Sequence, residues 1–136
     1  MPRVVLLDTG PLVAWLDRGD RDHARSRKFF ERFDGRLLTG WAVLTEVCHL
    51  VPARLAPALL RWVHAGAVEL ADPPQSALES IAAMMEKYGD LPMDLADASL
   101  LWIAQSRGVR EIATLDDTDF GIYRLPQGRR LRNVLA

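Results

Sequence analysis

The sequence predicts a three-layer α/β/α sandwich, in which helices cover both faces of a central parallel sheet of four to five strands. Short apolar runs typical of buried strands alternate with longer segments of helical pattern, the order expected of a parallel sheet. The 136 residues suffice for one domain with its own core. No internal repeat, low-complexity tract or linker divides the chain, so residues 1–136 are expected to form a single domain.

The elements follow from apolar runs and their flanking turn residues. Strands are predicted at residues 3–7, 36–40, 67–71 and 111–115, with a candidate fifth at 121–125. Helices are predicted from Pro11 onward, from a cap at Asp20 or Asp22 to about Phe33, and at 41–51, 55–64, 76–88 and 94–107. Ser76 and Glu79 have the spacing of a capping box, and Gly108 closes the last helix. Residues 131–136 receive no assignment.

Composition excludes several classes of protein. The chain is 49% hydrophobic and 26% charged with a net charge of −1, typical of a globular protein rather than a polycation. Asp8 interrupts the first apolar run, and no run reaches the ~18 residues of a membrane span, so we expect no membrane association. A signal peptide pattern is missing, which favours the cytoplasm. Cys48 is the only cysteine, which excludes an internal disulfide and a thiolate zinc cluster.

The stretch VVLLDTGPLVAW, residues 4–15, places the carboxylate of Asp8 between a predicted buried strand and a helix. Removing a carboxylate from water is costly, so its position needs a reason. Two interpretations are open. Asp8 caps the following helix, or it belongs to a cluster of acids that holds a cation.

Four separate segments set a carboxylate against an apolar background. In open parallel sheets, ligands bind beyond the carboxyl ends of the strands, where Asp8 and Asp116 are predicted to lie. Asp94 and Asp97 share one face at the start of a helix, and Glu46 interrupts another apolar helix. Taken singly, each aspartate can be a helix cap or a turn residue.

Gathered together, these acids favour a bound cation. Two carboxylates ~5 Å apart repel by roughly 3 kcal/mol at an effective dielectric constant of 20, and a divalent ion removes that repulsion. Oxygen ligands suit Mg²⁺ or Mn²⁺, whereas zinc prefers histidine or thiolate. We therefore expect Mg²⁺, with Mn²⁺ as a substitute.

The segments LLDTGPLVAWL, TEV, DLADASLLWIA and TLDDTDF, in this order, resemble the PIN domain, specifically the VapC-type toxin ribonucleases of bacterial toxin–antitoxin pairs. The resemblance spans about residues 4–124. It implies a PIN-like fold with the acids gathered in one pocket, and it matches Asp8, Glu46, Asp97 and Asp116 to the family's catalytic and metal-binding quartet. Residues in supporting positions are Thr9, Asp94, Thr114, Asp117 and Asp119, and Asp116 is favoured over Asp117 and Asp119 as the fourth metal ligand.

The implied activity is magnesium-dependent hydrolysis of RNA phosphodiester bonds. The resemblance also implies a homodimer and a cognate antitoxin protein. Arg18, Arg21 and Arg25 are candidates for contacting either RNA or an acidic segment of the antitoxin, since arginine suits phosphate and carboxylate partners. Two alternatives stay open: a PIN-like module that binds metal and RNA or a partner without cutting, and a metal-dependent phosphatase.

Overall fold

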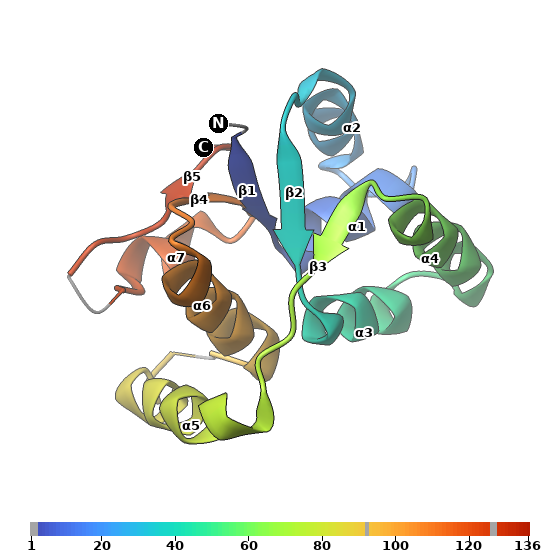
Figure 1. Ribbon diagram of the computed structural model, residues 1–136. Coiled ribbons are helices and arrows are strands. Elements are labelled where there is room, and N and C mark those ends of the chain that lie inside the picture. Colours follow the sequence, from blue (N-terminus) through green and yellow to red (C-terminus); the bar gives the residue numbers. More distant parts are fainter. Residues whose placement is uncertain (1–2, 92, 126–127) are drawn as a thin grey trace.

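The computed structural model describes residues 3–91, 93–125 and 128–136, and these form a five-stranded sheet in the order β3-β2-β1-β4-β5 (Figure 1). Every neighbouring pair of strands is parallel. The strands are β1 (Val4–Leu7), β2 (Arg36–Thr39), β3 (Val68–Leu70), β4 (Glu111–Ala113) and β5 (Arg132–Asn133). The predicted fold class is confirmed, with five strands in the sheet.

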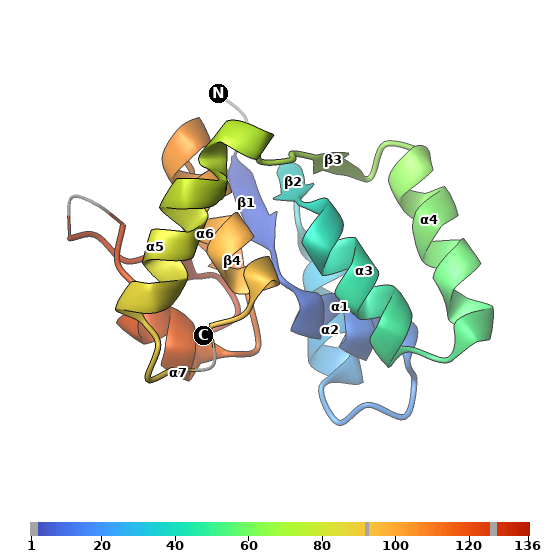
Figure 2. The same cartoon turned by 90° about the horizontal axis from the view of Figure 1, so that it is seen from below.

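Helices cover both faces of this sheet. They are α1 (Thr9–Leu16), α2 (His23–Arg32), α3 (Trp41–Leu50), α4 (Ala56–His64), α5 (Leu78–Lys87), α6 (Leu95–Arg107) and α7 (Asp117–Ile122), with short 3₁₀ turns η1 (Ala53–Leu55) and η2 (Gln75–Ala77). Helix α1 packs against α2 and α3, whereas α5 packs against α6. Figure 2 shows these two groups on opposite sides of β1 and β2, which gives the three layers.

Strand β1 is the centre of the molecule. Its residues Val5, Leu6 and Leu7 are 0% exposed, because β2 and β4 flank the strand and helices cover both its faces. On one side of β1 the sheet continues with β2 and then β3, and on the other side it continues with β4 and then β5. Such a switch in strand order opens a crevice at the carboxyl ends of the strands, which is where Asp8 follows β1.

The prediction of a strand at residues 121–125 is wrong. Residues 121 and 122 are the end of helix α7, and 123–125 belong to neither a helix nor a strand. The side chain of Asp116 accepts a hydrogen bond from the Asp119 amide and so starts this helix soon after β4. The fifth strand comes instead from the unassigned tail. The Asn133 side-chain amide exchanges hydrogen bonds with the backbone N–H and C=O of Thr114, at 3.2 and 3.0 Å, which fixes the tail beside β4.

The helix starts differ in part from the sequence-based prediction. Ser76 and Glu79 form no capping box, because a 3₁₀ turn precedes α5 and its N-cap is Ala77, without a side-chain hydrogen bond. Helix α2 begins after Asp22, whose side chain makes no capping bond either. Helix α6 matches its predicted bounds, with Asp94 at the N-cap and Gly108 in the left-handed conformation at the C-cap.

No helix in the described part of the chain combines the length and apolar character needed to cross a membrane.

Gly35 permits the close approach of β2 to β1. Its φ is +147°, and a Cβ atom at this position would lie 2.6 Å from the Arg3 carbonyl oxygen, which accepts a hydrogen bond from the Arg36 amide.

Gly35→Ala should therefore lower the free energy of unfolding by about 1–3 kcal/mol, measured by urea denaturation. The control is Gly121→Ala in α7, where nothing lies within 4 Å of the added Cβ; it should be neutral or stabilising by up to about 1 kcal/mol. Equal effects of the two substitutions would show that the contact between β1 and β2 tolerates a side chain.

Candidate active site

A cavity with a volume of 450 Å³ opens at the carboxyl ends of β1 and β4. Residues from the start of α1, the middle of α3, the start of α6 and the segment after β4 line it. They are Asp8, Thr9, Gly10, Glu46, Asp94, Asp97, Leu115, Asp116 and Asp119. The structure thus brings the four predicted acids together, although Asp8 and Asp97 are 89 positions apart in the chain.

Asp8 is the most deeply placed acid, with 6% of its surface exposed. It occupies the N-cap position of α1, but its side chain makes no capping hydrogen bond, so the capping interpretation does not explain this carboxylate. Instead, Oδ2 accepts a hydrogen bond of 2.7 Å from the Thr114 hydroxyl. Burial raises the pKa of Asp8, and this hydrogen bond opposes the rise.

Thr114 connects two of the acids. Its buried hydroxyl donates to Asp8 and also accepts a hydrogen bond of 2.9 Å from the backbone amide of Asp116. The end of β1 and the turn after β4 are therefore held in a fixed relation by one side chain.

Glu46 lies in the middle of α3 and is half-buried. Burial raises its pKa, and the neighbouring carboxylates of Asp94 and Asp8 raise it further, while the nearby Thr9 hydroxyl opposes the rise. The Thr9 hydroxyl oxygen is itself buried and has no hydrogen-bond partner at ordinary distance among the described residues. A buried hydroxyl without a partner beside a glutamate is a place where an ion or a water molecule fits.

Asp94 and Asp97 form the capping box of α6. Asp94 Oδ1 accepts from the Asp97 amide at 2.8 Å, and Asp97 Oδ2 accepts from the Asp94 amide at 3.5 Å. The capping interpretation is therefore correct for Asp94, although its side chain also lines the cavity. Burial, together with the negative charges of Asp94 and Asp8, raises the pKa of Asp97 to about 8.

The three aspartates after β4 are not equivalent. Asp116 caps α7 by accepting from the Asp119 amide at 3.2 Å, and both side chains line the cavity. Partial burial and the charge of Asp116 raise the pKa of Asp119. Asp117 is the first residue of α7, and its side chain lies outside the described part of the structure.

Tyr123 is a site residue that the sequence did not indicate. It is 1% exposed, and its hydroxyl approaches Asp97 Oδ2 at 3.5 Å. Burial raises the pKa of Tyr123, so the phenol stays protonated and points its donor at the acid. Sequence reasoning missed this residue because it lies in the segment 121–125 that was assigned to a strand.

The donor set fits a hard divalent cation. The side chains that line the cavity supply carboxylate and hydroxyl oxygens, and neither histidine nor cysteine lines it. Within the residues that the structure describes, no three ligand groups converge closely enough to coordinate an ion on their own. Magnesium needs fewer, since it usually keeps several waters and takes one or two carboxylates. Burial first, and then the negative charge of neighbouring carboxylates, raises the pKa values of Asp8, Glu46 and Asp97.

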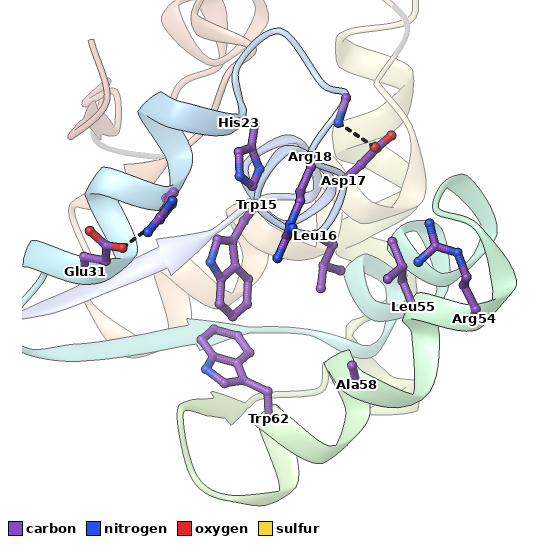
Figure 3. Close-up of a pocket in the computed structure, with 12 residues that line it drawn as sticks. Trp15, Leu16, Asp17, Arg18, His23, Glu31, Arg54, Leu55, Ala58 and Trp62 are labelled. Atoms are coloured by element: carbon purple, nitrogen blue, oxygen red, sulfur yellow. Dashed lines mark hydrogen bonds and ion pairs between the residues drawn. The ribbon is translucent and has the colours of Figure 1, made fainter.

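The three candidate arginines lie in different places. Arg18 lines a groove with a volume of 1150 Å³ between α1, α2 and α4, together with Trp15, Trp62 and Arg54 (Figure 3). Arg21 is exposed beside Asp22. The guanidinium of Arg25 donates to the Leu135 carbonyl oxygen, away from that groove.

The raised pKa of Asp97 should make the stability of the fold depend on pH. The pKa of Asp97 is about 8 in the folded chain and ordinarily 3.8, so the stability that its proton provides is complete below pH 4 and is lost as the pH rises through 8. In chelator at pH 9, Asp97→Asn should melt at least about 3 °C above wild type, and the difference should shrink toward pH 5. Asp72→Asn, an exposed aspartate outside the cavity, is the control. Identical pH profiles for wild type and Asp97→Asn would show that Asp97 lies in an ordinary environment.

Comparisons with known proteins agree with this arrangement. The family profile described as "PIN domain" matches residues 5–125. The chain is 31% identical over 130 residues to Ribonuclease VapC26 of Mycobacterium tuberculosis, covering 93% of this chain and 96% of that protein.

Solved structures share the fold at lower sequence identity. The Mycobacterium tuberculosis toxin VapC20, which cleaves the sarcin–ricin loop, gives a TM-score of 0.77 at 17% identity, over 84% of this chain and 91% of the other. A toxin–antitoxin complex from Klebsiella pneumoniae gives a TM-score of 0.63 at 20% identity, over 87% of this chain and 91% of the other. DNA-bound VapBC from Salmonella typhimurium gives a TM-score of 0.61 at 21% identity, over 98% of this chain and 98% of the other. The sheet, the acidic cavity and these matches together show that the chain belongs to the PIN domain family.

Proposed function

We propose that this chain is a magnesium-dependent endoribonuclease, which also accepts manganese and hydrolyses RNA phosphodiester bonds. The observation that carries the proposal is the convergence of six carboxylates on one cavity at the carboxyl edge of the sheet. Family membership and the relative at 31% identity, which is named a ribonuclease, support the choice of reaction. Among the described residues that line the cavity, Thr9 is the one with a hydroxyl and no histidine accompanies it as a base, which suits attack by water rather than by a side-chain nucleophile.

The roles of the residues follow from their positions. Asp8 and Asp97 would hold the principal ion, with Glu46 and Asp116 assisting it or a second ion. When bound, such an ion lowers the pKa of water and stabilises negative charge on the phosphate and the leaving oxygen. Thr114 keeps Asp8 in place, and Tyr123 holds Asp97 through its hydroxyl. At neutral pH Asp97 must release a proton before it binds an ion, because its pKa is about 8 without one.

We propose further that the chain is the toxin of a toxin–antitoxin pair. Structures with the same fold include a toxin–antitoxin complex and a VapBC assembly. The groove between α1, α2 and α4 offers a surface for a partner. Trp15 and Trp62 meet in it with ring centroids 4.7 Å apart, and Figure 3 shows Arg18 near Trp15 and Arg54 beside Leu55 on the other side of the groove. An amphipathic segment with acidic side chains fits this combination of apolar and cationic groups.

A homodimer is proposed on a different part of the surface. Trp41 and Leu50 of α3 are 55% and 58% exposed, and Leu78 at the start of α5 is 53% exposed. The exposed part of α3 around Trp41 is offered as the contact surface, because covering a large apolar side chain with a second copy of the chain is favourable.

Cleavage of RNA with and without metal tests the proposal. Purified protein should cut single-stranded RNA in the presence of Mg²⁺ or Mn²⁺, and chelator should abolish the activity. Asp97→Asn should lower the rate by about 10²–10³-fold, the loss typical when one electrostatic stabiliser of a transition state is removed. Asp72→Asn should cut at the wild-type rate, because this residue does not line the cavity.

The same assay separates the two alternatives. A module that only binds RNA would retain RNA on a filter in Mg²⁺ without producing fragments. A phosphatase would release chromophore from a phosphate monoester and leave RNA intact. Activity that survives exhaustive dialysis against chelator would contradict the metal mechanism.

A further inference from the structure

Two basic stretches, distant in the sequence, meet on one surface of the molecule. One stretch is in α2 and the other is the segment after residue 128. They come together with Arg3 around two adjoining pockets, of 320 and 630 Å³, that share Arg3 and Val134. We call this the basic surface, and its cations are Arg3, Arg25, Lys28, Arg32, Arg130 and Arg132.

The α2 part of the basic surface is a stripe. Arg25, Lys28 and Arg32 follow the spacing i, i+3, i+7, which places them on one face of the helix. Along the helix axis this stripe is about 10 Å long. Arg27 lies outside the stripe and lines the groove between α1, α2 and α4, where it pairs with Glu31 at 2.8 Å.

Positive charge on the basic surface is largely uncompensated. Among the described residues, no aspartate or glutamate side chain lines either pocket. Glu111 lies nearby and pairs with Arg3 at 2.7 Å and with Arg132 at 3.5 Å. Lys28, Arg32 and Arg130 are exposed and form no ion pair within the described part of the chain. Three free cations on one surface are notable in a chain whose net charge is −1.

The basic surface and the acidic cavity lie at opposite ends of β1. Arg3 precedes the strand and Asp8 follows it, and five residues of extended chain span about 16 Å. Figure 1 agrees with this placement, since α2 and both chain ends lie where β1 and β2 begin. At 3.4 Å per nucleotide of a stacked strand, about five nucleotides reach from one to the other.

We infer that the basic surface binds the phosphate backbone of the RNA substrate outside the catalytic cavity; this inference rests on the proposed function. The cavity is lined by carboxylates, which repel a polyanion, so affinity for RNA has to come from cations elsewhere. The stripe on α2 is about three nucleotide steps long, and the surface continues past Arg3 to Arg130, as a nucleic acid strand requires. Phosphate contacts of this kind give affinity and orientation but no sequence preference.

Binding measurements in chelator test the inference without any cleavage. Fluorescence anisotropy would compare a labelled 20-nucleotide RNA with a tetranucleotide, using wild type and the variant K28Q/R32Q/R130Q. The variant should bind the long RNA about tenfold more weakly at low salt. The slope of log affinity against log salt should become shallower by about two, because three phosphate contacts are lost. The tetranucleotide has fewer phosphates to contact, so it should bind wild type more weakly than the long RNA does and lose less affinity in the variant.

The matched control is R61Q/K87Q/R107Q, which removes the same charge from exposed positions outside the basic surface and outside the groove between α1, α2 and α4. It should retain the wild-type affinity for the long RNA. Equal losses in both triple variants, or no loss in K28Q/R32Q/R130Q, would overturn the inference. The inference is also overturned if K28Q/R32Q/R130Q loses affinity for poly-glutamate but keeps its affinity for RNA, because the basic surface would then bind an acidic protein.

Cleavage in Mg²⁺ separates this inference from the proposed function. K28Q/R32Q/R130Q should cut the tetranucleotide at the wild-type rate and show a raised KM, with unchanged kcat, only for the long RNA. If the wild-type protein binds the long RNA through the basic surface but cuts neither RNA, the ribonuclease proposal is contradicted. The inference about the basic surface then still holds. A fall in kcat for the tetranucleotide would show that these cations act at the catalytic cavity, which contradicts the inference.

Discussion

The desolvation of Asp8 is the constraint on which the rest of the site depends. Strand β1 is buried on both faces, and the residue that follows it emerges at the carboxyl edge with 6% of its surface exposed. A carboxylate there loses most of its hydration, and the hydrogen bond from Thr114 replaces only part of it. Burial raises the pKa of Asp8, which means that the folded state disfavours the charged form of this carboxylate. Stability alone gives no reason to place an acid at this position.

The surrounding acids add to that cost instead of relieving it. Glu46, Asp97 and Asp116 come from three other elements, and each brings negative charge toward Asp8. Asp94 combines two functions, since its carboxylate caps α6 while its charge raises the pKa of Asp97. Without a cation, protons must neutralise part of this charge. A divalent ion does so more effectively, and binding to the folded state then stabilises the fold.

Sequence reasoning found those parts of the site that have a local signature. An acid directly after a buried strand, an acid inside an apolar helix and two acids at a helix start are visible as patterns. They predict Asp8, Glu46 and Asp97, and the structure brings these three acids to one cavity. Helix α6 was also found, because its cap and its closing Gly108 both lie next to it in the sequence. The failures share a different cause. Strand β5 depends on hydrogen bonds between Asn133 and Thr114, 19 residues apart, and the role of Tyr123 depends on α7 replacing a predicted strand. The basic surface likewise exists only once the tail lies beside α2.

The central claim is that the acidic cavity at the carboxyl edge holds a divalent cation, with Asp8 and Asp97 as the principal ligands. Anomalous diffraction from crystals equilibrated with Mn²⁺ near pH 8 would locate such an ion directly. The account predicts a peak inside the cavity, with carboxylate oxygens of both aspartates at about 2.1 Å. Saturating Mn²⁺ with no peak in the cavity, or with peaks only elsewhere on the protein, would contradict it.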